Sequence, residues 1–332
     1  MSISKVVTSG IASEYVLSEF ASFLRGKGIE VIELDFASVT TDPIPILRSL
    51  AGECVTYITS AHLSITRRLA SIIAPHLTQL YPYYLCPIEI IPILRPRKAV
   101  YAPHDLLAPF GEESCDEYRY LDMFDGILTP YELDFRQGLL PSRCRVLNAG
   151  WIKFNDQSKA FPLNSSTPVI NGNRTSFCMS FVQHFRGKYG IEGTIEYYRP
   201  IFELPVVVKL PAWKGIEDLE QAIESSTPSQ IVPSSVNSIE LIMSSDIVLS
   251  NGASSTLAEA CLMGKKSICL QDSETEDLEL TRHKLKKFDS ILFHDYSQRQ
   301  SPIELLLPKL DPCVLRQPQF DFQRVFDFIC SL

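Results

Sequence analysis

One segment of the chain combines a glycine, small side chains and hydroxyl groups directly after an apolar run. Residues 246–251, DIVLSN, predict a buried strand, and a helical pattern begins a few residues later. The turn between them contains only small residues: Gly252, Ala253, Ser254, Ser255 and Thr256. Glycine permits unusual backbone angles and close approach of a ligand to the main chain. Free N–H groups and the dipole at a helix start favour phosphate, so the segment predicts a phosphate-binding turn.

Thr256 and Glu259 also admit a structural explanation. A threonine N-cap with a glutamate three residues further on forms a capping box. This alternative accounts for these two residues but not for the small residues that precede them. We therefore count Glu259 among the binding candidates, together with the turn.

Basic residues follow two further predicted strands. Lys209 ends the apolar run 206–209, while His184 and Arg186 come after a strand expected at Ser176–Val182. Cations at such places can neutralise a diphosphate leaving group. The alternatives are a strand-end surface lysine and an ordinary basic loop.

A histidine stands at another predicted strand end, in the segment Tyr101–Asp105. A neutral imidazole with a pKa of about 6.5 can take a proton from an attacking hydroxyl at neutral pH, so His104 is the candidate general base. Asp105 either orients the ring or acts as the base itself. The alternative is a structural histidine in a Pro-His turn. His62, which follows the segment YITSA, is a second candidate base.

The elements that position these residues alternate between short apolar runs and helical stretches. Strands are expected at Lys5–Thr8, Glu30–Asp35, Cys54–Thr59, Ala99–Ala102, Gly126–Thr129 and Arg145–Asn148, then at Ser176–Val182, Val206–Lys209, Ile247–Ser250 and Ser267–Leu270. Helices are expected at Glu14–Arg25, Ile65–Leu80, Thr194–Phe202, Asn237–Ser244 and Thr256–Met263. Strands separated by helices form right-handed βαβ units and parallel sheets.

The polar segment Asn155–Asn173 predicts an interdomain linker, with a long surface loop as the alternative. The chain of 332 residues then divides into an N-terminal domain at 1–155 and a C-terminal domain at 170–318. An amphipathic helix at 319–332 is expected to pack back toward the first domain. The predicted fold class is α/β, with two Rossmann-like parallel-sheet domains facing a cleft.

Composition narrows the functional classes. With 45% hydrophobic and 21% charged residues the chain is typical of a soluble globular protein, and its net charge of −8 argues against a nucleic-acid partner. The nine cysteines include no C-x-x-C pair, which favours buried thiols in a reducing compartment. We see no metal site, cofactor motif, signal peptide or membrane span, so we expect a cytoplasmic protein.

The segment SSDIVLSNGASSTLAEACLMGKKSICL resembles the donor-binding region of GT-B transferases. The nearest pattern is that of the CDP-glycerol glycerophosphotransferase-like proteins, matched here by Asp246, Ser254, Ser255, Gly264 and Lys265. The segments YAPHDLLAPFG, DGILTP and RVLNAGWIK resemble further strands of that group in the same order. UDP-GlcNAc 2-epimerases and several glycosyltransferases have related loops.

The resemblance implies a metal-independent GT-B transferase with donor bound by the second half and acceptor by the first. The glycerophosphotransferase-like proteins carry K-P-H-P where this chain has Lys209-Leu210-Pro211-Ala212, which shifts weight toward sugar transfer. The implied partners are a nucleotide-activated donor and a glycan or lipid-linked acceptor for surface polysaccharide or glycoconjugate synthesis, with peripheral membrane association left open. Alternatives are polyol-phosphate transfer, epimerisation or hydrolysis of a nucleotide sugar, and a non-catalytic binding scaffold.

Overall fold

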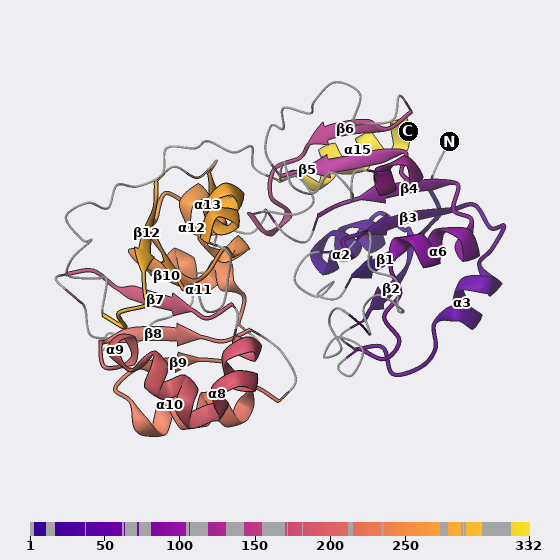
Figure 1. Ribbon diagram of the computed structural model, residues 1–332. Helices are drawn as coiled ribbons and strands as arrows, with labels where there is room; N and C mark the ends of the chain where they lie inside the picture. The colour runs from indigo at the N-terminus through magenta and orange to yellow at the C-terminus, as the bar shows by residue number, and fades with distance from the viewer. Residues whose placement is uncertain are drawn as a thin grey trace. The chain divides into compact units, whose positions relative to one another are not determined.

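The computed structural model divides the chain into two compact units, Met1–Asn155 with Gln317–Leu332, and Asp156–Arg316 (Figure 1). It describes residues 3–10, 17–36, 38–61, 63, 72, 81–103, 106, 119–130, 143–154, 170, 172–180, 182–211, 215–233, 236–272, 278–286, 288, 290–300 and 320–332. Each unit contains a six-stranded parallel sheet with helices, which confirms the predicted α/β class with two Rossmann-like sheets. The helix expected at Ile65–Leu80 lies outside the described residues apart from Ile72.

The first unit is built on a sheet with the strand order β2-β1-β3-β4-β5-β6. Its strands are β1 (Lys5–Gly10), β2 (Glu30–Asp35), β3 (Val55–Thr59), β4 (Lys98–Tyr101), β5 (Gly126–Thr129) and β6 (Arg145–Asn148). Short runs rich in valine, isoleucine and threonine suit buried parallel strands. The chain reverses its direction of travel across the sheet between β1 and β3, which makes this pair the topological switch point.

Helices cover both faces of the first sheet. They are α2 (Ser18–Gly26), α3 (Ile44–Ser49), α6 (Pro87–Leu94) and α15 (Phe322–Ser331), with short 3-10 helices at Arg119–Met123 and Ile152–Phe154. Helices α3 and α6 bury Leu47 and Ile90 in one core with Tyr57 and Tyr101. Helix α2 contributes the rings of Phe20 and Phe23 to the contact with α15.

Helix α15 brings the end of the chain onto the first unit. The Phe322 ring centroid lies 5.5 Å from those of Phe20 and Phe23. The Lys98 ammonium donates to the carbonyls of Ile329 and Cys330 at 3.0 Å each. Because these carbonyls belong to the last helical turn, the lysine also meets the negative end of the helix dipole. The helix therefore docks through aromatic contacts to α2 and through charged contacts, which include a second one from Arg145 to the carbonyl of Ser331 at 2.9 Å.

The second unit has the strand order β12-β11-β10-β7-β8-β9. Its strands are β7 (Thr175–Cys178), β8 (Val206–Lys209), β9 (Gln230–Val232), β10 (Ile247–Asn251), β11 (Lys266–Gln271) and β12 (Ile291–Asp295). Counted within the unit, this is the 3-2-1-4-5-6 order of dinucleotide-binding folds. The switch point falls between β7 and β10, which pair in parallel from Ile247 with Thr175 to Ser250 with Cys178.

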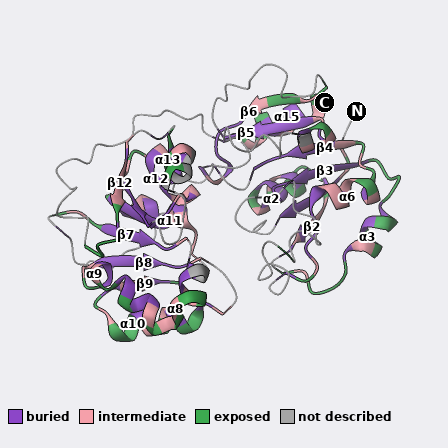
Figure 2. Cartoon of the chain, viewed as in Figure 1, coloured by how far each residue is buried: buried purple, intermediate pink, exposed green. Residues whose placement is uncertain are grey.

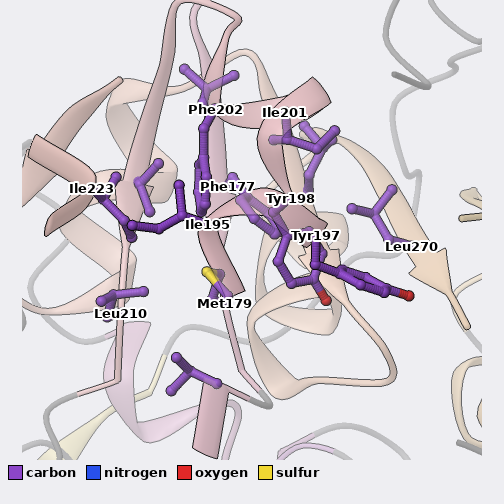
Figure 3. Close-up of a cluster of buried hydrophobic side chains, with 14 of the residues drawn as sticks. Phe177, Met179, Ile195, Tyr197, Tyr198, Ile201, Phe202, Leu210, Ile223 and Leu270 are labelled. Carbon is purple, nitrogen blue, oxygen red and sulfur yellow. The ribbon is translucent and has the colours of Figure 1, made fainter. Parts of the chain in front are cut away.

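The helices of the second unit are α8 (Val182–Tyr197), α9 (Arg199–Phe202), α10 (Glu217–Ser226), α11 (Ser238–Ser244), α12 (Ser255–Leu262) and α13 (Leu278–Leu285). Helices α8, α9 and α10 cover one face of the sheet. Their core includes Phe177, Tyr198, Ile201 and Phe202, which Figure 3 shows gathered beside the strand that carries Phe177. In Figure 2 the strands are largely buried, whereas exposed residues lie on outer helices such as α10.

Several predicted boundaries are wrong in the second half. The strand expected at Ser176–Val182 ends at Cys178, and helix α8 begins at Val182. The segment is apolar on both sides of the turn at Met179–Ser180, and a short apolar run does not distinguish a strand from a buried helical turn. The helix expected at Thr194–Phe202 is the later part of α8 followed by α9. The predictions also missed α10, β9, α13 and β12 in the second half, and α3 and α6 in the first.

Candidate functional site

The predicted phosphate turn lies at the switch point of the second sheet. Strand β10 ends at Asn251, the turn passes through Gly252, and α12 begins at Ser255. Strand β7, the neighbour of β10 across the switch point, ends at Cys178 and leads through Ser180 into α8. Ligands of doubly wound sheets bind outside the carboxyl ends of the strands at such a point. The turn therefore occupies the place where this topology favours a ligand.

Gly252 shapes the turn. Its φ of 75° lies in the left-handed region, which costs a residue with a side chain about 1–2 kcal/mol. Its N–H donates to the carbonyl of Leu270 on β11 at 2.8 Å. The main chain thereby bends away from β10 while it stays attached to the sheet. Ala253, the next residue, is partly exposed.

Ser254 caps helix α12, so the capping-box explanation built on Thr256 is wrong. The Ser254 hydroxyl accepts a hydrogen bond from the N–H of Leu257 at 3.4 Å and donates to the hydroxyl of Ser250 at 2.9 Å. Ser255 and Thr256 instead occupy the first turn of the helix and are partly exposed. Of the three hydroxyls predicted to contact a ligand, that of Ser254 already has two partners, one on β10 and one on α12.

Two charged candidates are buried near the end of β7. Lys209 pairs with Cys178 in the sheet and is 9% exposed, and Glu259 on α12 is fully buried. Burial raises the pKa of the Cys178 thiol to about 12, while Lys209 opposes the rise and Glu259 adds to it. Both charges therefore act on the same strand end. Glu259 also accepts a hydrogen bond from the Ser238 hydroxyl at 3.1 Å.

The two basic candidates on α8 lie in its first half. His184 falls in the first turn, and its side chain lies outside the described residues. Arg186 donates to the carbonyl of Gly215, and its guanidinium lies 3.6 Å from the carboxylate of Asp218. Arg186 thus joins α8 to the segment that leads into α10.

Two residues that carry the family resemblance, Asp246 and Lys265, form hydrogen bonds to the main chain. The Asp246 carboxylate accepts from the N–H of Arg174 at 2.8 Å, at the amino ends of β7 and β10. The Lys265 ammonium donates to the carbonyl of Met243 at 3.0 Å, and burial lowers the pKa of this lysine. Both lie at the opposite end of the strands from the turn at Gly252.

Sequence reasoning missed Ser180, Asn251 and Tyr198, which adjoin the turn. The N–H of Ser180 donates to the Asn251 side chain at 2.7 Å, and the Asn251 amide donates to the Tyr198 hydroxyl at 3.1 Å. The hydroxyls of Ser180 and Ser250 share a hydrogen bond of 3.1 Å. The strand was predicted to continue to Val182, so Ser180 was assigned to the strand and not to the loop that follows Cys178.

The candidate bases of the first unit, His104 and Asp105, lie outside the described residues, as does His62. Strand β4 ends at Tyr101, and the two residues that follow it are buried. The chemical roles of His104, Asp105 and His62 stay predictions.

Hydroxyl groups gather at the switch point of the first sheet. The Ser9 hydroxyl lies 2.6 Å from that of Tyr57 and 2.8 Å from that of Thr59. Among the described residues, the buried hydroxyls of Thr8 within β1 and of Ser60 after the end of β3 have no hydrogen-bond partner. Buried hydroxyls are normally paired, so an unpaired one at a strand end is a candidate ligand contact.

Metal-binding clusters and membrane-spanning helices are absent from the described part of the chain. No group of three or more histidine, cysteine, aspartate or glutamate side chains forms a potential metal site there. No helix within those residues is long and apolar enough to span a membrane.

Comparison with known proteins identifies the fold. No model of a known protein family matches the chain, and no curated protein matches its sequence. The Methanocaldococcus jannaschii UDP-GlcNAc 2-epimerase in complex with UDP-GlcNAc and UDP matches with a TM-score of 0.56, 11% identity and 100% of both chains covered. A second structure of that epimerase matches with a TM-score of 0.50, 9% identity and 100% of both chains.

A lower TM-score of 0.44 relates the chain to Acinetobacter baumannii MurG, with 10% identity over 99% of this chain and 100% of that one. The likeness to the epimerase structures covers the whole chain, including both parallel sheets. The chain therefore has the GT-B type of fold, as the sequence predicts.

Proposed function

We propose that this protein is a glycosyltransferase that uses a nucleotide-diphosphate sugar as donor. The observation that carries the proposal is the glycine turn at the second switch point, where Gly252 leads from β10 into the start of α12. A helix start after a tight glycine turn is a phosphate-binding arrangement. The dinucleotide-type strand order supports the same position for a nucleotide.

In this proposal the diphosphate binds at residues 252–256, with Lys209 as the cation and Glu259 as an acceptor for donor hydroxyls. His184 and Arg186 on α8 are further donor contacts. Lys209 and Glu259 are both buried beside the end of β7, where charges interact more strongly than in water. A cation and helix dipole at the leaving diphosphate supply the charge stabilisation that the transfer needs.

The acceptor is proposed to bind the first unit and to be a glycan or a lipid-linked glycan of surface polysaccharide or glycoconjugate synthesis. The support is the cluster of Ser9, Tyr57 and Thr59 hydroxyls at the first switch point, together with the buried hydroxyl of Ser60, which has no hydrogen-bond partner among the described residues. In the transfer, the bond between the anomeric carbon and the diphosphate oxygen breaks and a bond to the acceptor oxygen forms. His104 or Asp105 takes the acceptor proton, and the nucleoside diphosphate leaves with the bonding electrons.

The test is calorimetric titration with UDP, GDP and CDP, followed by an assay of nucleotide release from activated donors with and without acceptor. We expect a nucleoside diphosphate to bind and its release from the sugar donor to depend on acceptor. The Lys209→Met variant should bind the diphosphate about tenfold more weakly, through loss of one charge-assisted contact. Lys266→Met, at the amino end of β11, should bind as the wild type does.

Other outcomes separate the alternatives. Release of CMP would instead indicate polyol-phosphate transfer. Wild-type protein that neither binds nor is stabilised by any nucleotide would refute the proposal and leave a binding scaffold.

A second candidate is epimerisation or hydrolysis of a nucleotide sugar. It is favoured by the TM-score of 0.56 with the UDP-GlcNAc 2-epimerase structure. Release of UDP, or a change of sugar configuration, without any acceptor would support this candidate over transfer.

A further inference from the structure

The two turns at the second switch point are joined by side chains that come from both faces of the sheet. Successive residues of a strand point to opposite faces. Ser250 accordingly meets Ser254 at the start of α12, whereas Asn251 reaches Tyr198 on the side of α8 and α9. Both also contact Ser180, in the turn after β7.

Asn251 is the centre of this arrangement. Its side chain is 4% exposed and spans the gap between the N–H of Ser180, 2.7 Å away, and the Tyr198 hydroxyl, 3.1 Å away. An amide uses its oxygen and its nitrogen for these two contacts, so its orientation is determined by both partners. Asn251 directly precedes Gly252, so these two hydrogen bonds hold the residue from which the turn leaves the strand.

Tyr198 is in turn held by a rigid aromatic cluster. Its ring stacks on that of Tyr296 with centroids 5.5 Å apart and an interplanar angle of 18°, and it lies 5.3 Å from the ring of Phe177. Tyr198 and Phe177 can be followed in Figure 3. Because protein interiors are close-packed, the ring packing restricts the position of the Tyr198 hydroxyl.

We propose that Tyr198 and Asn251 are positioning residues for nucleotide binding. They hold the turn 252–256 in the conformation that receives a diphosphate and act through the main chain, without touching the ligand. This inference rests on the proposed donor site. It extends that site to residues in the core, which sequence reasoning did not connect with it.

The matched pair of variants is Tyr198→Phe and Tyr296→Phe. Each removes one hydroxyl from one of two stacked, fully buried tyrosines. The Tyr296 hydroxyl donates to the carbonyl of Tyr197 at 3.3 Å, whereas that of Tyr198 accepts from Asn251, the residue before the turn. A purely structural role predicts the same result for both variants.

The first measurement is hydrogen exchange of the amides at residues 251–257 without nucleotide. We expect exchange in Tyr198→Phe to rise about fivefold, the equivalent of one hydrogen bond of about 1 kcal/mol, and to stay at the wild-type rate in Tyr296→Phe. Equal rates in the two variants would overturn the inference.

The second measurement is the Kd for UDP. A rise of about fivefold is expected for Tyr198→Phe alone, with similar melting temperatures for the two variants. Equal affinities would overturn the inference even if the exchange rates differed. Wild-type protein that binds neither UDP nor another nucleoside diphosphate would refute the proposed donor site instead, and hydrogen exchange would still decide whether Tyr198 positions the turn.

Discussion

Replacement of Gly252 by alanine tests whether the backbone of the turn is the binding element. Gly252 has a φ of 75°, and Gly264, at the other end of the same helix α12, has a φ of 71°. Alanine at either position carries almost the same backbone strain. Only Gly252 adjoins the carboxyl end of β10, whereas Gly264 is exposed and follows the last turn of the helix. Gly264→Ala is therefore the matched control.

The expected magnitudes follow from these angles. A left-handed conformation costs a non-glycine residue about 1–2 kcal/mol, so both variants should lose about that much stability. For a unit of this size each kcal/mol lowers Tm by about 2–4 °C. If the strained turn also loses one backbone hydrogen bond to a charged phosphate, binding falls by a further 1.5–3 kcal/mol, or roughly 10- to 150-fold in Kd.

The assays are urea denaturation for stability and calorimetric titration with the nucleoside diphosphate that binds the wild type. We expect similar stability losses in the two variants and weaker nucleotide binding only in Gly252→Ala. Equal affinity in Gly252→Ala and wild type would refute the assignment of the turn to phosphate. Equal loss of affinity in both variants would show that binding responds to general destabilisation.

Three further predictions concern other described residues. Ser254→Ala should lose about 0.5–2 kcal/mol of stability because Ser254 caps α12, whereas Thr256→Ala should change the free energy of unfolding by less than about 0.5 kcal/mol. Urea denaturation measures both, and a larger loss in Thr256→Ala than in Ser254→Ala would restore Thr256 as the cap. Ile329→Ala on α15 should lower the free energy of unfolding of the first unit by about 2–5 kcal/mol, and Gln323→Ala, at an exposed position, is the control expected to be neutral. Equal stability of the two variants would show that the first unit does not need α15 for its stability. At pH 8 iodoacetamide should modify exposed Cys54 and spare Cys178, because burial raises the pKa of the Cys178 thiol to about 12 and keeps it protonated at pH 8. Detection of labelled Cys178 in folded protein by mass spectrometry would contradict its burial.

Much of the fold could be predicted because each strand is a short apolar run between polar turns. The strand expected at Glu30–Asp35 has these bounds in the structure, and so do those at Gly126–Thr129, Arg145–Asn148 and Val206–Lys209. The strand before Ser180 was predicted too long because apolar residues continue through Phe181 into α8. Strand β9 covers Gln230–Val232 alone, which is too short for a clear alternation.

The candidate site was predictable in part. A glycine and small residues after β10 pointed to the turn, and the structure places Gly252 in the left-handed conformation that such a turn requires. The capping residue was assigned to Thr256 because Glu259 stands three residues further on, as in a capping box, and only the structure shows that the helix begins at Ser255 with Ser254 as its cap. The proposed roles of Lys209, Glu259 and His104 stay predictions.

The sequence by itself determined the alternation of strands and helices, and with it two parallel sheets and a glycine turn at the start of a helix. These are properties of neighbouring residues, which local patterns encode. Only the tertiary structure placed β7 beside β10, so that Ser180 meets Asn251 across a separation of 71 residues and Tyr198 meets it across 53. Strand order depends on how whole elements bury their faces against each other, and no local pattern contains that information.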